Sequence, residues 1–127
     1  MDLSTATDRV ERQVRDVQAQ LTSEQYTPSD IEQSEPFDCL SELGELTGES
    51  SREVSFTVAF TGDPQPLSDA VTRLMKDAGA TLDGNEGADR STVRWVLGGD
   101  YYQLMYQLAS VGDLANFTGI TECGSPD

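Results

Sequence analysis

The chain has 127 residues, of which 36% are hydrophobic, and its 23 acidic residues against 8 basic ones leave a net charge of −15. A chain of this length fits one domain whose core needs neither a metal nor several disulfides. The charge argues against a nucleic-acid partner, because phosphate contacts need clustered lysine and arginine, and it would also repel an anionic membrane surface.

The basic residues are almost all arginine, since seven arginines accompany the single lysine, Lys76. This usage has two interpretations. One is a GC-rich bacterial genome, whose codons favour arginine, and the other is a halophile, whose acidic surface keeps proteins dissolved in concentrated salt. We prefer the first interpretation, and the second stays open.

Residues 4–22 are predicted to form a helix. The apolar positions are spaced four, three and four residues apart and define one narrow stripe: Val10, Val14, Val17 and Leu21. The flanks are charged, and Arg9, Arg12 and Arg15 form the one place in the sequence where basic residues gather. We expect the stripe to pack on a sheet, which is commoner in a short domain than packing on a partner helix.

Residues 27–52 are expected to form a long acidic linker. Eight acids and one base, Arg52, occur from Asp30 to Glu53 with both ends counted. Three leucines at spacings of three could make a turn or two of helix after Cys39: Leu40, Leu43 and Leu46. Loops of this length in a compact domain are usually functional or disordered.

The rest of the chain carries the patterns of a core. Alternating apolar and polar residues predict strands over 53–60, 92–97, 101–110 and 114–121. The stretch 101–110 also fits a helix, but its aromatic residues and the glycine turns on both sides favour a strand. Helical spacing predicts a helix from Leu67 to Ala78 that stops at Gly79, and the polar run 83–87 predicts a turn.

These elements predict an α+β fold, a two-layer sandwich with an antiparallel sheet of about four strands in the order α-β-α-β-β-β and with helices on one face. We expect one domain, composed of an N-terminal helix (1–26), an acidic linker (27–52) and an α+β core (53–127).

The sequence has no histidine, which removes Ser/His/Asp and Cys/His catalytic sets and histidine-ligated metals. Residues 83–89 resemble the start of a calcium loop, but Ala88 replaces the required glycine and Arg94 stands where a glutamate should close the site. We therefore predict no enzyme, no cofactor and no metal.

Four aromatic residues could form a ligand platform: Trp95, Tyr101, Tyr102 and Tyr106. At alternating positions of a strand such residues are more often core residues or cross-strand pairs. A binding surface is the second interpretation, and it requires that one set of these rings is exposed.

Cys39 and Cys123 are the only cysteines, 84 positions apart. Neither lies in a CxxC motif, and two thiols without histidine make a poor zinc site, so we predict a structural disulfide. Persistent disulfides belong to oxidising compartments, which places the protein outside the cytoplasm. Residues 1–4 lack the charged start and apolar stretch of a signal peptide, so we expect this sequence to be the mature part.

The layout resembles the mature domain of small actinobacterial cell-envelope lipoproteins. The matching features are Phe37-Asp38-Cys39, the strand Val54 to Phe60, the helix Leu67 to Ala78 and Thr121-Glu122-Cys123-Gly124. The resemblance implies a lipid-carrying cysteine that anchors the domain outside the membrane. Because no cysteine precedes Cys39, the anchor would belong to a segment upstream of this chain.

Two functions follow as hypotheses. The preferred one is a non-enzymatic, extracytoplasmic domain of a cell-envelope lipoprotein, monomeric and held to the membrane only through its lipid. The alternative is an acidic cytosolic inhibitor or immunity protein that binds a basic partner.

Overall fold

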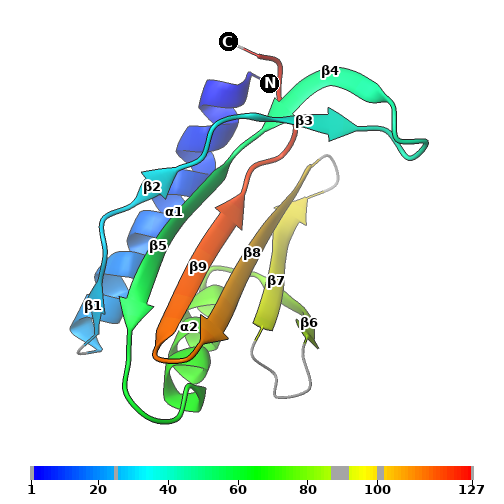
Figure 1. Ribbon diagram of the computed structural model, residues 1–127. Helices are drawn as coiled ribbons and strands as arrows, with labels where there is room; N and C mark the ends of the chain where they lie inside the picture. Colours follow the sequence, from blue (N-terminus) through cyan, green and yellow to red (C-terminus); the bar gives the residue numbers. More distant parts are fainter. Residues whose placement is uncertain (1, 25, 87–91, 100–101, 127) are drawn as a thin grey trace.

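A computed structural model describes residues 2–24, 26–86, 92–99 and 102–126 of the protein (Figure 1). These residues form two helices, α1 (Leu3–Ser23) and α2 (Gln65–Asp77), and nine strands. Five strands lie between the helices: β1 (Thr27–Pro28), β2 (Glu32–Gln33), β3 (Phe37–Leu40), β4 (Leu46–Ser51) and β5 (Glu53–Ala59). Four follow α2: β6 (Thr81–Glu86), β7 (Thr92–Gly99), β8 (Tyr102–Val111) and β9 (Leu114–Ile120).

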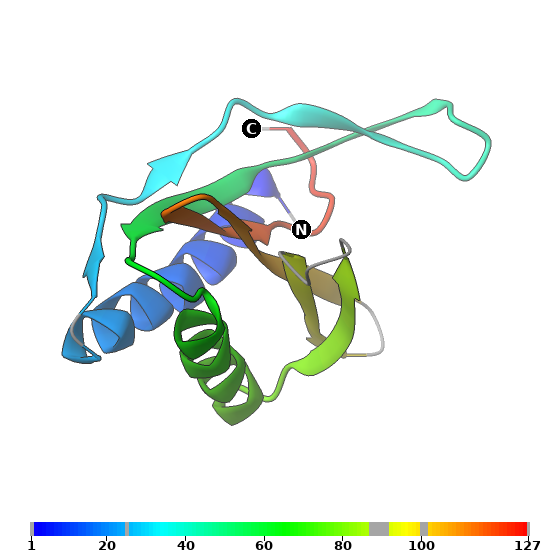
Figure 2. The ribbon, with the colours of Figure 1, turned by 60° about the horizontal axis from the view of Figure 1, so that its bottom comes forward.

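Seven strands form one antiparallel sheet in the order β1-β5-β9-β8-β7-β6, with β2 paired to β5 as well. Strands β6 to β9 form a meander, and β5 pairs with β9 along its whole length. Helix α2 carries the chain from β5 to the far edge at β6. Both helices lie on the same face of the sheet, whereas β3 and β4 form a separate hairpin that projects from the body (Figure 2).

Helix α1 buries the predicted apolar stripe completely, since Val10, Val14, Val17 and Leu21 are 0% exposed. Its N-terminus is capped by Asp2, whose Oδ1 accepts a hydrogen bond from Thr5 N at 2.8 Å. Hydrogen bonding from the side chain of Thr5, and then from its backbone N–H, lowers the pKa of the Asp2 carboxyl. The contribution of the charged cap to stability is therefore present at neutral pH and is lost as the pH falls through the lowered pKa.

The core is centred on Phe117 of β9. Its ring lies 5.5 Å from the ring of Phe56, 6.0 Å from that of Tyr106 and 6.5 Å from that of Trp95. All four side chains are at most 1% exposed. Strands β5, β7, β8 and β9 thus contribute to one aromatic cluster beneath the helices, with aliphatic residues around it.

The predicted α+β class, the antiparallel sheet and the two helices are confirmed, and Gly79 ends α2 with a φ of +92°. The expected sheet of about four strands and the order α-β-α-β-β-β are wrong. Strand β6 occupies part of the predicted turn 83–87, because its ladder with β7 outweighs the turn preference of Asp83, Gly84 and Asn85. A bulge between Leu82 and Gly84 accommodates these residues.

The segment 27–52 is not an irregular linker. It contains β1 and β2 at the edge of the sheet and the β3–β4 hairpin, and it forms no helix at Leu40, Leu43 and Leu46. Backbone pairing to β5 holds β1 and β2 in place although they bury little apolar surface.

Neither α1 nor α2, the helices of the described residues, combines the length and the apolar composition that a membrane span requires.

Candidate functional site

The β3–β4 hairpin and its turn, residues 37–51, form what we call the arm. From Phe37 to Glu49 every residue except Cys39 is exposed. The turn is closed by Ser41, whose N donates to Glu45 O at 2.8 Å and whose Oγ accepts from Leu43 N at 3.3 Å. The arm is therefore an ordered projection without a core of its own.

Three leucines occupy the end of the arm and form what we call the leucine tip: Leu40, Leu43 and Leu46. They are 60%, 88% and 71% exposed. Leu40 and Leu46 are directly opposite each other in the hairpin, so their side chains lie on one side. Large apolar side chains gathered on an exposed projection are typical of a surface that binds another protein.

The leucine tip is surrounded by negative charge. Four exposed acids lie in the arm, and no basic residue occurs there: Asp38, Glu42, Glu45 and Glu49. No pair of opposite charges therefore neutralises the arm from within. Glu42 and Glu45 lie in the turn among the leucines, and Asp38 and Glu49 lie in the strands.

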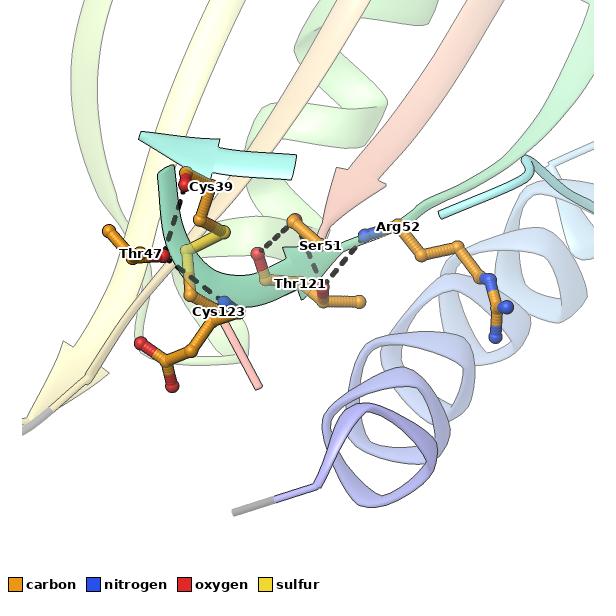
Figure 3. Close-up of a disulfide and its surroundings, with 7 residues drawn as sticks. Cys39, Thr47, Ser51, Arg52, Thr121 and Cys123 are labelled. Atoms are coloured by element: carbon orange, nitrogen blue, oxygen red, sulfur yellow. Dashed lines mark hydrogen bonds between the residues drawn. A yellow bond between two sulfur atoms is a disulfide. The ribbon is translucent and has the colours of Figure 1, made fainter. Parts of the chain in front are cut away.

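A disulfide joins the arm to the C-terminal tail, residues 121–125 (Figure 3). Cys39 and Cys123 are bonded as predicted, with sulfurs 2.07 Å apart and Cα atoms 6.3 Å apart. An isolated two-stranded hairpin is marginally stable in water. The covalent bond compensates for the missing core by holding β3 to the body of the protein.

The tail also contacts the root of the arm through hydrogen bonds. Ser51 Oγ donates to Thr121 O at 2.8 Å, and the backbone N–H of Arg52 donates to Thr121 Oγ1 at 3.0 Å (Figure 3). Ser50 and Gly124 exchange two backbone hydrogen bonds of 2.9 Å. The side chains of Ser51 and Thr121 are buried, in contrast to the exposed leucines of the tip.

A second feature is a cavity of about 670 Å³ between α1 and the strands β7 and β8, which we call the arginine groove. Its helix wall consists of Arg9, Arg12, Gln13, Arg15 and Asp16. Its strand wall includes Leu97 and Tyr106. The volume falls in the range of about 300–1,000 Å³ that small-molecule sites occupy.

Two of the three arginines in the groove hold internal ion pairs. Arg9 Nη1 lies 2.7 Å from Glu122 Oε1, and Arg15 Nη2 lies 3.3 Å from Glu11 Oε1. Arg12 has no ion-pair or hydrogen-bond partner among the described residues that line or surround the groove. The groove therefore contains the guanidinium of Arg12, which has no ion-pair partner there, beside two guanidinium groups that are held by ion pairs.

The predicted aromatic platform does not form from the residues whose side chains are described. Trp95 and Tyr106 are cross-strand partners and are both 0% exposed, so they belong to the core. Tyr101 lies outside the described residues, as does the side chain of Tyr102. Tyr106 borders the arginine groove from within the core, with no side-chain surface exposed to solvent.

Among the described residues, no group of three or more Asp, Glu, His or Cys side chains is placed so that it could hold a metal ion. Sequence reasoning noted the arginines of α1 but could not place them opposite Leu97 and Tyr106, because no local sequence pattern indicates that proximity.

Comparison with protein-family models, with curated proteins and with solved structures finds no match for this chain.

Proposed function

We propose that this protein is a non-enzymatic recognition domain that works outside the cytoplasm and inserts its leucine tip into an apolar cleft of a basic protein partner. The observation that carries the proposal is the exposure of three leucines at the end of an arm that is covalently held to the body. Exposed leucine costs solvation free energy in the unbound protein, and burial against a partner recovers it.

The charge of the arm supports a basic partner. The four acids around the tip would repel another acidic protein and attract a cleft rimmed by lysine and arginine. Complementary charge of this kind mainly raises the association rate and selects the partner, whereas the buried apolar side chains hold the complex together.

The disulfide supports an oxidising location, since cytosolic thiols are kept reduced. Within that location we propose a cell-envelope lipoprotein, in line with the layout described above. Its test is the coding sequence upstream of Met1. A signal peptide followed by a cysteine supports the anchor, and an upstream sequence that encodes neither contradicts it.

The same arm suits a second function, an acidic cytosolic inhibitor or immunity protein that blocks a basic active site. The two functions differ in compartment. Cells of the native organism lysed directly into a denaturing maleimide reagent should show Cys39 and Cys123 unmodified until a reductant is added. Two modified cysteines without reductant would contradict the extracytoplasmic proposal and favour the inhibitor.

The arm itself is tested by capture from a native envelope extract at low salt. The baits are the wild type, the tip variant Leu40→Ser/Leu43→Ser/Leu46→Ser and the control Val111→Ser/Leu114→Ser, whose side chains are 81% and 50% exposed on the β8–β9 turn. We expect a basic protein that the wild type and the control retain and that the tip variant loses.

With that partner purified, the tip variant should bind at least about thirty-fold more weakly, as expected when central apolar contacts are removed. Raising sodium chloride to about 0.5 M should slow association by screening the acidic arm. A partner that the tip variant binds as well as the wild type does would overturn the proposal, and so would the absence of any partner sensitive to the tip.

A further inference from the structure

We propose that the arginine groove binds a small organic anion that has one carboxylate or phosphate group and an apolar or aromatic body. This site is separate from the arm. It lies on the helix face of the sheet, and none of its lining residues belongs to residues 37–51.

The helix wall can supply the anion-binding groups. Arg9, Arg12 and Arg15 come from about two turns of α1 and line the cavity together with Gln13. A guanidinium offers several donors in a planar fork, which matches a carboxylate or a phosphate in a bidentate arrangement. These arginines lie beside three acids, Glu11, Asp16 and Glu122, and among the described residues Arg12 is the one of the three without an ion-pair partner.

The internal ion pairs orient two of these groups without removing them from the site. Glu122 is only 15% exposed and holds Arg9 from the tail, and Glu11 holds Arg15 from the same helix. Glu11 also accepts a hydrogen bond from Gln33 Nε2 at 3.1 Å, which ties it to β2. Arg15 keeps N–H groups beyond those that the carboxylate of Glu11 occupies.

The strand wall can hold the apolar part of the ligand. Leu97 is partly buried against the core and supplies the exposed apolar surface of this wall, whereas Tyr106 borders the cavity but is 0% exposed. A ligand that placed an anionic group at Arg12 could lay an apolar body against Leu97. This division between a charged wall and an apolar wall is common in small-molecule sites.

Asp16 also lines the groove, and its negative charge provides a second test of anion binding. Its Oδ2 accepts a hydrogen bond from Gln20 Nε2 at 3.1 Å, and its carboxylate would repel the anion. Removal of this charge should therefore strengthen binding, which is the opposite of the effect expected for Arg12.

The experiment is an amide chemical-shift titration of the full chain with three probes of similar size: 2-naphthoate, phenyl phosphate and the uncharged 2-naphthylmethanol. We expect the anionic probes to shift the signals of residues 9–16 and the signal of the one indole, Trp95, which is the cross-strand partner of Tyr106. Preference for the carboxylate or the phosphate probe identifies the head group.

Two of the variants, Arg12→Gln and Arg73→Gln, each remove one positive charge. Arg12→Gln should weaken binding of the preferred anionic probe about tenfold, the loss of one charge-assisted contact. Arg73→Gln is the control, because Arg73 is an exposed arginine of α2 that lies far from the groove. Its ion-pair partner Glu24 follows the C-terminus of α1, about 18 Å along that helix from Arg12. Asp16→Asn should tighten binding, and Arg73→Gln should leave it unchanged.

Binding weaker than about 1 mM for both anionic probes would overturn the proposal. Equal binding of 2-naphthylmethanol would overturn it as well, because the arginine wall would then contribute nothing. Shifts confined to residues outside the groove, or an equal loss in Arg12→Gln and Arg73→Gln, would show that the anions respond to the overall charge and would reject the site.

Discussion

Gly119 of β9 lies where α1 packs against the sheet. A Cβ atom at this position would be 2.6 Å from Val10 Cγ1 and 2.9 Å from Tyr106 Cε1. These neighbours are fully buried and cannot move into solvent. The glycine therefore sets the distance between the helix and the sheet, and indirectly the width of the arginine groove, which α1 and Tyr106 both line.

Gly119→Ala should lower the free energy of unfolding by about 1–3 kcal/mol, the usual cost of overpacking a core. Urea unfolding followed by the fluorescence of Trp95 measures it. The double variant Val10→Ala/Gly119→Ala removes the nearest clashing methyl group and should cost less than the sum of the two single variants. Strict additivity would show that the helix, and not the Val10 side chain, absorbs the extra methyl.

The arm is the element whose order depends most on the disulfide. The bond closes a loop across a sequence separation of 84 residues and joins a hairpin to the end of the chain. Cys39→Ser/Cys123→Ser should lower the free energy of unfolding by about 2–4 kcal/mol, because the unfolded chain regains the entropy of that loop.

Hydrogen exchange distinguishes this general effect from a local one. If the bond also orders the arm, the amides of residues 37–47 should lose more protection in the double variant than those of β5 and β9 do. An arm whose protection falls only in step with global stability would show that the hydrogen bonds of Ser51 and Thr121 suffice to order it.

The elements that sequence reasoning located are those whose side-chain periodicity matches their burial. Strand β5 alternates exposed and buried residues, and α1 buries one helical stripe, so both patterns are visible in the sequence. The missed elements lack this signal. Strands β1 and β2 have two residues each, one of them Pro28, and exist through pairing with β5.

The candidate sites were predictable to different degrees. The Cys39–Cys123 bond followed from the absence of any histidine or CxxC motif. The spacing of Leu40, Leu43 and Leu46 suggested a helix, whereas the structure pairs Leu40 with Leu46 across a hairpin and leaves them exposed. The groove depends on contacts between α1 and strands about 80 to 100 residues later, which no local pattern encodes.

At the scale of the whole molecule, charge opposes folding. The net charge of −15 is concentrated as the chain becomes compact, and repulsion among the acids lowers its stability. The described residues contain three salt bridges, all with exposed or partly exposed partners, which recover little of this cost. The acidic arm projects from the body, which separates its charges from the rest of the surface (Figure 2).

Salt should therefore stabilise the protein. Raising sodium chloride from low concentration to about 0.3 M should increase the free energy of unfolding by about 1 kcal/mol, or the melting temperature by about 4 °C, because screening weakens repulsion more than it weakens three surface pairs. The variant Glu42→Gln/Glu45→Gln/Glu49→Gln carries fewer arm charges, so its stability should respond less to salt.

A plateau in stability near about 0.3 M sodium chloride indicates simple screening and favours the GC-rich bacterial interpretation of the composition. A rise that continues into molar salt would favour the halophile, and a fall in stability with salt would show that the ion pairs of Arg9, Arg15 and Arg73 outweigh the repulsion.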